Sequence, residues 1–405
     1  LRIEDTDRRR FVPGATEKMI KMLRLFGINW DEYYVQSERL DWYRKAAKKL
    51  LAQGHAFYCQ CGARNAKKEG YSKELRDPCR EKNLASGAIK LKIPADERIS
   101  FRDFVVGKEI SWETAAVADT TLLKSNGFPT YHLAVVVDDH EMKISHVFRG
   151  HDWMPSTPIH LLVYRYLSFK LPQIGHLTDI LDPAGGKISK RKGSISCEEF
   201  LAQGFLPEAI LNFIMLLGWA PKDNREIFPL ANFVANFQKG SLQVANPVFN
   251  RTKLDWFNGC YLRQKSDKEL LQLLKPFLPA SARVDLVAQT IPLIKDRIVK
   301  LSDYVPLAGF FFSEPKVGRQ LFTASAKEQL TKAISVLEKL ATWEKPPIEE
   351  SLQGLVKKEN WPMGEFFMNF RIAVTGSKFT PPITDSVAIL GRQKTLQRLK
   401  LALKI

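Results

Sequence analysis

The most informative segment of this chain reads Gly185-Gly186-Lys187-Ile188-Ser189-Lys190-Arg191-Lys192-Gly193. Four cations between glycines make a loop that suits a polyphosphate, because glycine lets backbone N–H groups approach an anion closely. Lysine ammonium groups add mobile charges that can follow charge into a transition state. A Lys/Arg run taken alone is more often a solvated basic loop, but the order of residues here is more particular. We therefore predict a phosphate-contacting loop at this place.

Two motifs carry a resemblance to a known family. Residues 187–191 resemble the Lys-Met-Ser-Lys-Ser loop of class I aminoacyl-tRNA synthetases, which contacts ATP during amino-acid activation. Arg2-Ile3-Glu4-Asp5-Thr6-Asp7 resembles the glutamyl-tRNA synthetases in particular, because the related glutaminyl enzymes usually carry Asp-Asp-Thr-Asn there. Taken alone, an acidic cluster before arginines is most often a salt-bridged strand end. The two motifs stand at about the family's separation, and the resemblance covers nearly the whole chain.

The resemblance implies a fold and a domain order. We expect an α/β Rossmann-type nucleotide-binding catalytic domain with an inserted α+β acceptor-binding subdomain, followed by all-α C-terminal domains. The expected boundaries are 1–53 for the rest of the first catalytic half, 54–118 for the inserted acceptor-stem-binding subdomain, 119–196 for the second half with the lysine loop, 197–265 for a helical stem-contact domain and 266–405 for a helical anticodon-binding region.

The chain begins at Leu1, without an initiator Met. Class I synthetases place a Rossmann strand and a His-Ile-Gly-His type helix before the motif at residues 2–7, with an Arg that helps to hold the substrate side chain. These features are absent from the sequence, so we interpret it as an N-terminally truncated or incompletely assembled gene product. A targeting peptide cannot be assessed for the same reason.

Apolar spacing predicts the local elements. The expected elements are helices over 17–26, 38–53, 156–169, 209–219 and 250–262, a hairpin over 99–108, a hairpin whose arms 121–123 and 131–137 flank Asn126-Gly127, and a strand over 176–181 that feeds the lysine loop. A strand that ends in a phosphate-contacting loop is where open α/β folds bind nucleotides.

The resemblance implies a two-step reaction with ATP and Mg²⁺. The α-carboxylate of glutamate attacks the α-phosphate of ATP, and the terminal hydroxyl of the tRNA then takes the glutamyl group from the adenylate. Nucleotidyl transfer needs positioning and cationic stabilisation more than a covalent nucleophile. We expect Lys190 to stabilise the departing pyrophosphate, supported by Lys187 and Arg191. The expected ATP contacts are Lys187, Ile188, Ser189, Lys190, Arg191, Asp152 and Trp153.

The glutamate site follows from the same resemblance. Arg149 aligns with the family's substrate-binding Arg, Tyr131 with a Tyr of the same pocket, and Glu4 with the acidic residue that meets the substrate's amino group. A guanidinium can hold a carboxylate with two hydrogen bonds. The plain alternatives are an ordinary salt bridge for Arg149 and a core position for Tyr131. Val135 departs from relatives that carry an Asn facing the substrate, and we assign no catalytic role to His151.

The cysteines raise the question of zinc. Cys59, Cys61 and Cys79 resemble a site that some glutamyl enzymes carry in the inserted subdomain, where zinc would need four ligands. The usual fourth ligand is not at its usual spacing, and Tyr71 and Glu81 are the nearby candidates. Ordinary thiols and a metal site are about equally supported, so we expect less than one zinc per chain.

Composition agrees with a nucleic-acid partner. The net charge is +17, and residues 261–405 carry 23 Lys+Arg against 14 Asp+Glu. We expect this region to read tRNA(Glu) through Arg371, Lys378, Arg392, Lys394, Arg398 and Lys400. Apolar runs fall short of the roughly 18 residues of a membrane helix, and five cysteines favour a reducing cytoplasm. L-Glutamate, ATP and tRNA(Glu) are the expected partners of a monomer.

Three alternatives stay open. A glutaminyl-tRNA synthetase would carry β-barrels in its anticodon region, whereas residues 266–405 lack strand alternation. A short tRNA-modifying paralogue would lack the basic C-terminal third. The chain could also be a catalytically dead tRNA-binding remnant, because the first ATP motif is missing from the sequence.

Overall fold

The computed structural model describes residues 1–61, 76–188, 196–238 and 241–405. The described chain divides into two compact units. The first consists of residues 1–188 and 214–249, and the second of residues 189–213 and 250–405. The domain boundaries that we predicted inside these units remain predictions.

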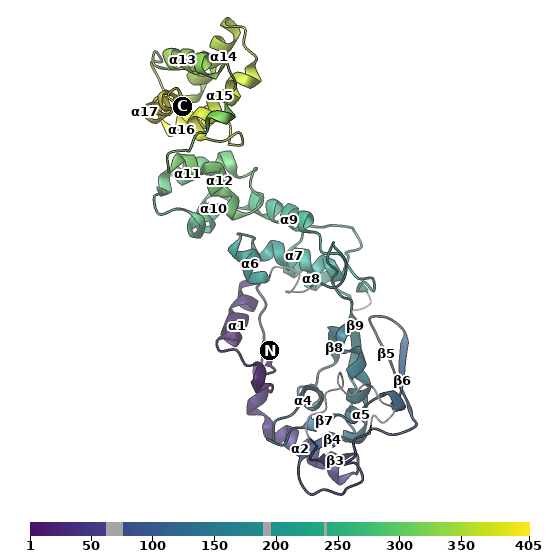
Figure 1. Cartoon of the computed structure of the whole chain (residues 1–405). Coiled ribbons are helices and arrows are strands. Elements are labelled where there is room, and N and C mark those ends of the chain that lie inside the picture. Colours follow the sequence, from purple (N-terminus) through teal and green to yellow (C-terminus); the bar gives the residue numbers. More distant parts are fainter. Residues whose placement is uncertain (62–75, 189–195, 239–240) are drawn as a thin grey trace. The chain divides into compact units, whose positions relative to one another are not determined.

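The first unit is α/β (Figure 1). Its described elements are β1 (Arg2–Ile3), α1 (Ala15–Leu25), β2 (Tyr34–Val35), α2 (Leu40–Ala52), β3 (Ala56–Cys59), β4 (Ala88–Leu91), β5 (Arg98–Arg102), β6 (Glu109–Glu113), β7 (Thr121–Leu123), α4 (Tyr131–Glu141), β8 (His146–Gly150), α5 (Thr157–Leu167), β9 (Gln173–Leu177) and α8 (Leu230–Asn236). The pairs β1–β2 and β8–β9 are parallel, whereas β3-β4-β7 and β5–β6 are antiparallel. Parallel pairs are what the expected Rossmann-type domain requires.

Helices α2, α4 and α5 pack against one another and form much of the core of this unit. The core also contains a buried polar centre. Asp138 on α4 is fully buried and accepts hydrogen bonds from Gln36, Arg39 and Tyr43 at 2.8–2.9 Å. A buried carboxylate is tolerable only when such donors surround it, so these contacts join α4 to α2 and the segment before it.

The structure corrects one predicted strand. The turn at Asn126-Gly127 forms, with Gly127 at φ +81°, and Leu123 pairs with Pro129. The chain then enters α4 at Tyr131 and does not continue as a strand over 131–137. Residues 133–139 are all buried between α2 and α5. A short apolar run does not distinguish a buried helix from a strand, and packing here overrides the strand preference of valine.

The other local predictions in the first unit agree with the structure within a few residues. Helices α1, α2 and α5 and the β5–β6 hairpin lie where the apolar spacing indicated. Strand β9 is displaced toward the N-terminus and ends at Leu177, so the predicted strand over 176–181 overlaps it by two residues.

The second unit is helical over its described residues. It contains α6 (Cys197–Ala202), α9 (Arg251–Gln264), α10 (Asp267–Leu274), α11 (Val284–Ile294), α12 (Tyr304–Ala308), α13 (Ala326–Leu337), α14 (Lys345–Lys358), α15 (Met363–Thr375), α16 (Ile383–Leu390) and α17 (Arg392–Ala402), and it shares α7 (Pro207–Gly218) with the first unit. Local sequence features determine where several of these helices begin or end. Ser266 and Glu269 form a capping box at the start of α10, and Gly376 ends α15 at φ +74°. The expectation of an all-α C-terminal region is confirmed.

Candidate active site and metal cluster

A cavity of about 740 Å³ lies in the first unit. Its lining includes Glu4, Tyr131 and Arg149, the three residues predicted to bind glutamate, together with Val135. Glu4 follows β1, Tyr131 begins α4, and Arg149 lies on β8. The structure therefore brings together three side chains that are distant in sequence. The cavity also contains Arg2 and Asp139, which sequence reasoning did not select.

Arg149 is buried and held by neutral acceptors. Its Nε donates to Nε2 of His176 at 3.1 Å and its Nη1 to Nδ1 of His160 at 2.8 Å. Its Nη2 donates to the hydroxyl of Thr157 at 2.6 Å. A guanidinium has five N–H donors, so two remain beyond these contacts, and none of the three partners is a carboxylate. The Tyr131 side chain is close enough to hydrogen-bond the guanidinium as well, so a ligand would meet the remaining donors beside this hydroxyl. Such an arrangement suits an anionic ligand.

The hydrogen bonds define the protonation of the surrounding histidines. Because Arg149 only donates, Nδ1 of His160 must accept, and its Nε2 then donates to Nδ1 of His132 at 3.0 Å. In the same way Nε2 of His176 accepts from Arg149. Its Nδ1–H therefore donates to Oδ2 of Asp103 at 2.7 Å.

All three histidines are held neutral. Burial lowers the pKa of His132 to about 4, with Arg149 as a second cause. Burial and then Arg149 lower the pKa of His160 well below its usual value. Burial also lowers the pKa of His176, although the bond to Asp103 opposes the shift. Burial lowers the pKa of Arg149 itself, but a guanidinium stays charged at neutral pH.

Two carboxylates, Glu4 and Asp139, also line the cavity. Arg2 donates to Glu4 at 3.0 Å and to Asp139 at 2.7 Å. Asp139 is buried, whereas the side chain of Glu4 is 37% exposed. Glu4 is therefore the accessible acidic group of this pair, as an ammonium ligand would require.

The described beginning of the lysine loop lies beside Asp152, one of the predicted ATP residues. Lys187 pairs with Asp152 and with Asp179, the second at 2.8 Å. These hydrogen bonds, that to Asp152 first, raise the pKa of Lys187. Trp153 lies against Tyr131 with ring centroids 4.3 Å apart. The region thus joins the predicted ATP and glutamate sites. Ile188 is the last described loop residue, and Ser189, Lys190 and Arg191 lie outside the described residues.

The three predicted cysteines gather with a residue that the sequence reasoning missed. One ligand atom each from Cys59, Cys61, Asp77 and Cys79 lie within 4.8 Å of one another. The sulfur of Cys59 is 3.2 Å from Asp77, and those of Cys61 and Cys79 are 3.3 Å apart. Three thiols and a carboxylate fit a tetrahedral zinc ion. The fourth candidate in the cluster is thus Asp77 and not Glu81, while Tyr71 lies outside the described residues.

The pKa values of the ionisable groups in the cluster are shifted in different directions. Burial raises the pKa of Cys59 to about 12, whereas a hydrogen bond from the backbone of Gln60 lowers that of Cys79. Burial would raise the pKa of Asp77, but hydrogen bonds from Lys90 and from the Cys79 backbone outweigh it and bring the value to about 2.

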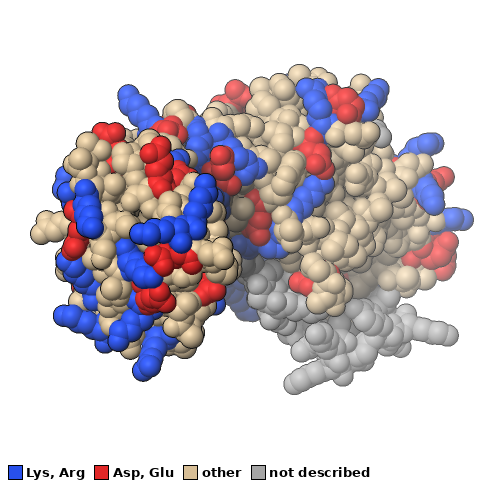
Figure 2. Space-filling model, turned by 90° about the horizontal axis from the view of Figure 1, so that it is seen from above, with Lys and Arg blue, Asp and Glu red and all other residues tan. Residues whose placement is uncertain are grey.

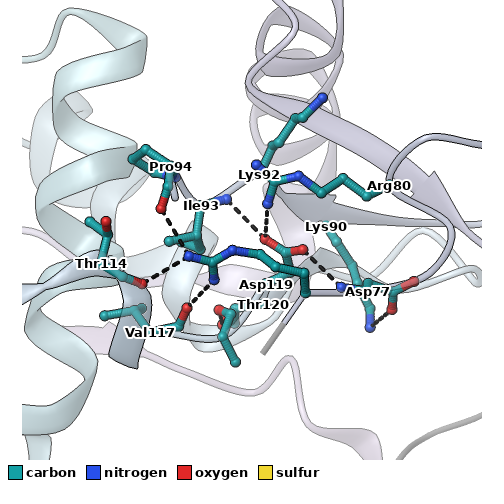
Figure 3. A network of polar contacts seen from close by, with 12 residues as sticks. Asp77, Arg80, Lys90, Lys92, Ile93, Pro94, Thr114, Val117, Asp119 and Thr120 are labelled. Carbon is teal, nitrogen blue, oxygen red and sulfur yellow. Dashed lines mark hydrogen bonds and ion pairs between the residues drawn. The ribbon is translucent and has the colours of Figure 1, made fainter. Parts of the chain in front are cut away.

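A buried carboxylate beside the cluster holds its backbone. Asp119 accepts from the backbone N–H groups of Ile93 and Asp77 and from Arg80, all at 2.9–3.0 Å (Figure 3). These bonds tie the segment that carries Asp77 to the chain just after β4 and to the chain after β6. Asp77 is therefore held in place by backbone contacts that do not depend on a metal ion.

The predicted tRNA-binding cations differ in their surroundings. Lys378 is exposed, and Arg371 on α15 has a buried Nε without a hydrogen-bond partner among the described residues. Burial, and then the nearby Arg297, lower the pKa of Arg371. Arg392 donates to the carbonyl of Leu340 and lies over the Trp343 ring. Arg392 therefore also joins α17 to the segment between α13 and α14.

Arg398 is a correction to the predicted tRNA contacts. Its guanidinium is buried and donates to the backbone carbonyls of Val374, Phe310 and Ser313 at 2.7–3.0 Å. It therefore stabilises the packing of α17 and is not available to a phosphate. On the face shown in Figure 2, Lys and Arg side chains project with Asp and Glu side chains between them.

Comparisons with known proteins agree with this geometry. Residues 1–256 match the family model described as "tRNA synthetases class I (E and Q), catalytic domain", and residues 269–403 match "Anticodon binding domain". Among the described residues, the helices are all too short or too polar to cross a membrane.

Related proteins align with the whole length of this chain. A glutamate–tRNA ligase of Dehalococcoides mccartyi is 38% identical over 439 residues, covering 100% of this chain and 90% of the relative. One of Treponema denticola is 34% identical, with 100% and 92% covered. The crystal structure of a glutamate tRNA ligase from Elizabethkingia meningosepticum, in complex with its amino acid, is similar with a TM-score of 0.85 at 28% identity, covering 100% of this chain and 92% of that one.

Proposed function

This chain belongs to the glutamate–tRNA ligases, a family of class I tRNA synthetases, and from this premise we propose how its residues attach glutamate to tRNA(Glu). The reaction consumes ATP and proceeds through glutamyl-adenylate. The cavity that contains Glu4, Tyr131 and Arg149 carries the proposal, because it combines an exposed carboxylate with a guanidinium whose described partners are neutral.

In this proposal Arg149 binds the side-chain carboxylate of glutamate with its two remaining N–H donors. Glu4 receives the α-ammonium group, and Tyr131 borders the substrate between them. Glutamine would offer one carbonyl oxygen and an NH₂ group in place of a carboxylate. The NH₂ group would face guanidinium donors without an acceptor, so the same contact selects against glutamine.

The lysine loop would serve the nucleotide. Lys187, Lys190 and Arg191 supply cations for the polyphosphate, with Ile188 and Ser189 in the same loop and with Asp152 and Trp153 beside it. Mg²⁺, bound with ATP, would supply further charge neutralisation. Lys187 must exchange its pairs with Asp152 and Asp179 for phosphate oxygens, which limits how tightly the loop holds an anion before the transition state.

The C-terminal helices would bind the tRNA. Arg371 and Lys378 are the cations that we propose for phosphate or base contacts, with a smaller contribution from Arg392 because of its internal bonds. Arg297 extends this group, since it lies near Arg371 and its Nη1 is 3.5 Å from the carbonyl of Thr380. We propose that the protein acts as a monomer in the cytoplasm.

The test is aminoacylation by the complete gene product. We expect glutamate-dependent ATP–pyrophosphate exchange and glutamyl-tRNA formation with tRNA(Glu), with glutamine and tRNA(Gln) as the matched comparisons. Charging of glutamine would favour the glutaminyl alternative. Binding of tRNA without exchange for any amino acid would favour the inactive remnant.

A further inference from the structure

We propose that Asp103, in the turn of the β5–β6 hairpin, is a positioning residue for glutamate recognition that acts on Arg149 through His176. This inference rests on the function proposed above. Asp103 does not line the cavity, and it lies 46 residues before Arg149 in the chain. Its effect would therefore be transmitted by the hydrogen bonds that connect these three side chains.

Asp103 is fully buried, and both of its carboxylate oxygens are used. Oδ1 accepts from the backbone N–H groups of Val105 and Val106 at 2.9 and 3.0 Å. Oδ2 accepts from the backbone N–H of His176 at 3.1 Å and from its ring Nδ1 at 2.7 Å. All four partners are donors, so a carboxylate suits this place and an amide does not. An amide NH₂ would have to face donors on one of the two sides.

The bond to Asp103 determines what His176 offers to Arg149. With the proton on Nδ1, the ring presents the lone pair of Nε2, which accepts from Nε–H of Arg149 at 3.1 Å. The other tautomer would set an N–H group against a guanidinium that can only donate. His176 and Arg149 are direct partners in the parallel register of β9 and β8. The orientation of the guanidinium is therefore coupled to the tautomer of its neighbour.

The hairpin turn is also fixed against the same strands. The N–H of Phe104 donates to the carbonyl of Ile174 at 3.2 Å. The Phe104 ring packs edge-on against the Phe148 ring, with the two ring centroids 5.0 Å apart. Gly175 admits this approach, because a Cβ there would lie 2.5 Å from the side chain of Val105. Asp103 thus belongs to a turn packed on β8 and β9. Its position is fixed by this packing as well as by its own hydrogen bonds.

The consequence concerns specificity. Three bonds, to His176, His160 and Thr157, direct three N–H groups of Arg149 and thereby set where the remaining two point. Loss of the correct acceptor at His176 would let the guanidinium rotate. A bidentate contact to a carboxylate depends strongly on such orientation, whereas ATP does not touch this group in our proposal.

The test compares two buried aspartates of the same region. In the complete gene product, Asp103→Asn should raise the KM for glutamate at least tenfold and leave the KM for ATP within twofold. Asp119→Asn is the matched control, because Asp119 is also buried and accepts from two backbone N–H groups and a side chain, but lies in the network of Figure 3 and does not contact His176. It should leave both constants within twofold. An unchanged glutamate KM in Asp103→Asn, or an equal rise in both variants, would overturn the proposal.

If Asp103→Asn fails to fold, a second pair of variants tests whether His176 acts as the hydrogen-bond acceptor for Arg149. The Gln side chain can place an acceptor oxygen near the position of Nε2, whereas Asn reproduces the donor at Nδ1 and is too short to reach Arg149. His176→Gln should therefore retain a glutamate KM at least fivefold lower than His176→Asn. Equal constants in the two variants would refute the role of His176 as acceptor. Absence of glutamate-dependent exchange in the unaltered protein would instead refute the proposed function.

Discussion

The ammonium group of Lys90 lies 2.6 Å from a carboxylate oxygen of Asp77, the fourth side chain of the cysteine cluster. A zinc ion with three thiolates and this carboxylate would carry a net charge of −2. Lys90 offsets one unit of that charge at a mostly buried place, where Coulombic interactions are stronger than in water.

We accordingly expect about one zinc ion per chain, more than the sequence predicts, because Asp77 adds a fourth candidate ligand to the three cysteines. Elemental analysis of the purified protein measures it. Cys79→Ser and Asp77→Ala should lose most of the metal, and Lys90→Met should weaken zinc binding about tenfold. Cys197→Ser, outside the cluster, is the control. Zinc-free protein after purification with added zinc would contradict this expectation.

Arg149→Lys should raise the KM for glutamate by one to two orders of magnitude. An ammonium group cannot reproduce a planar two-donor contact. If its three N–H donors met His176, His160 and Thr157, none would remain for the substrate carboxylate. Steady-state exchange kinetics measure the effect. Arg165→Lys, at a half-exposed pair with Glu97, serves as control and should change little. A glutamate KM equal to that of the unaltered protein would show that Arg149 does not bind the side-chain carboxylate of glutamate.

Lys190→Ala should lower the rate of glutamate activation by about 10²–10³-fold and leave the affinity for tRNA unchanged. The reason is that a cation that meets charge developing in the transition state acts on rate more than on ground-state binding. Pyrophosphate exchange and filter binding of tRNA measure the two quantities. Loss of tRNA affinity with full pyrophosphate exchange would contradict the proposal, because Lys190 would then contact tRNA and not ATP.

Folding stability should decrease as pH falls from about 6.5 to about 4. The pKa of His132 is about 4 in the folded chain, below its usual 6.5, and those of His160 and His176 are also lowered. In this window the unfolded chain binds more protons than the folded one, so acid favours unfolding. Each such histidine contributes a slope of up to about 1.4 kcal/mol per pH unit. Denaturant titrations of the unaltered protein and His132→Gln measure the difference, and parallel pH profiles would contradict it.

Arg371→Ala and Lys378→Ala should each weaken tRNA(Glu) binding and reduce the slope of log affinity against log salt by about one, if each cation meets a phosphate. Arg398→Lys is an informative comparison, because Arg398 is buried and bonded to three carbonyls. It should lower stability and leave the salt slope unchanged. A slope that is the same in all three variants would exclude phosphate contacts at Arg371 and Lys378.

Much of the fold could be predicted because its signals are local. The helical periodicity of residues 17–26 and the turn at Asn126-Gly127 specify elements through contacts within a turn or two of chain. The predicted strand over 131–137 is wrong because no local signal there distinguishes a strand from a helix. Its run of valines is equally compatible with a helix, and only the packing of α4 between α2 and α5 favours the helix.

The family, the lysine-loop motif, the helical C-terminal region and the residue types of the proposed glutamate site could be inferred from sequence, because short motifs and periodic patterns carry them. The side chains that accompany them became apparent only in the folded chain. Asp77 joins cysteines as far as 18 residues away, and Asp103 meets His176 across 73 residues. Such contacts depend on strand register and on the packing of separate elements, and no local period in the sequence records them.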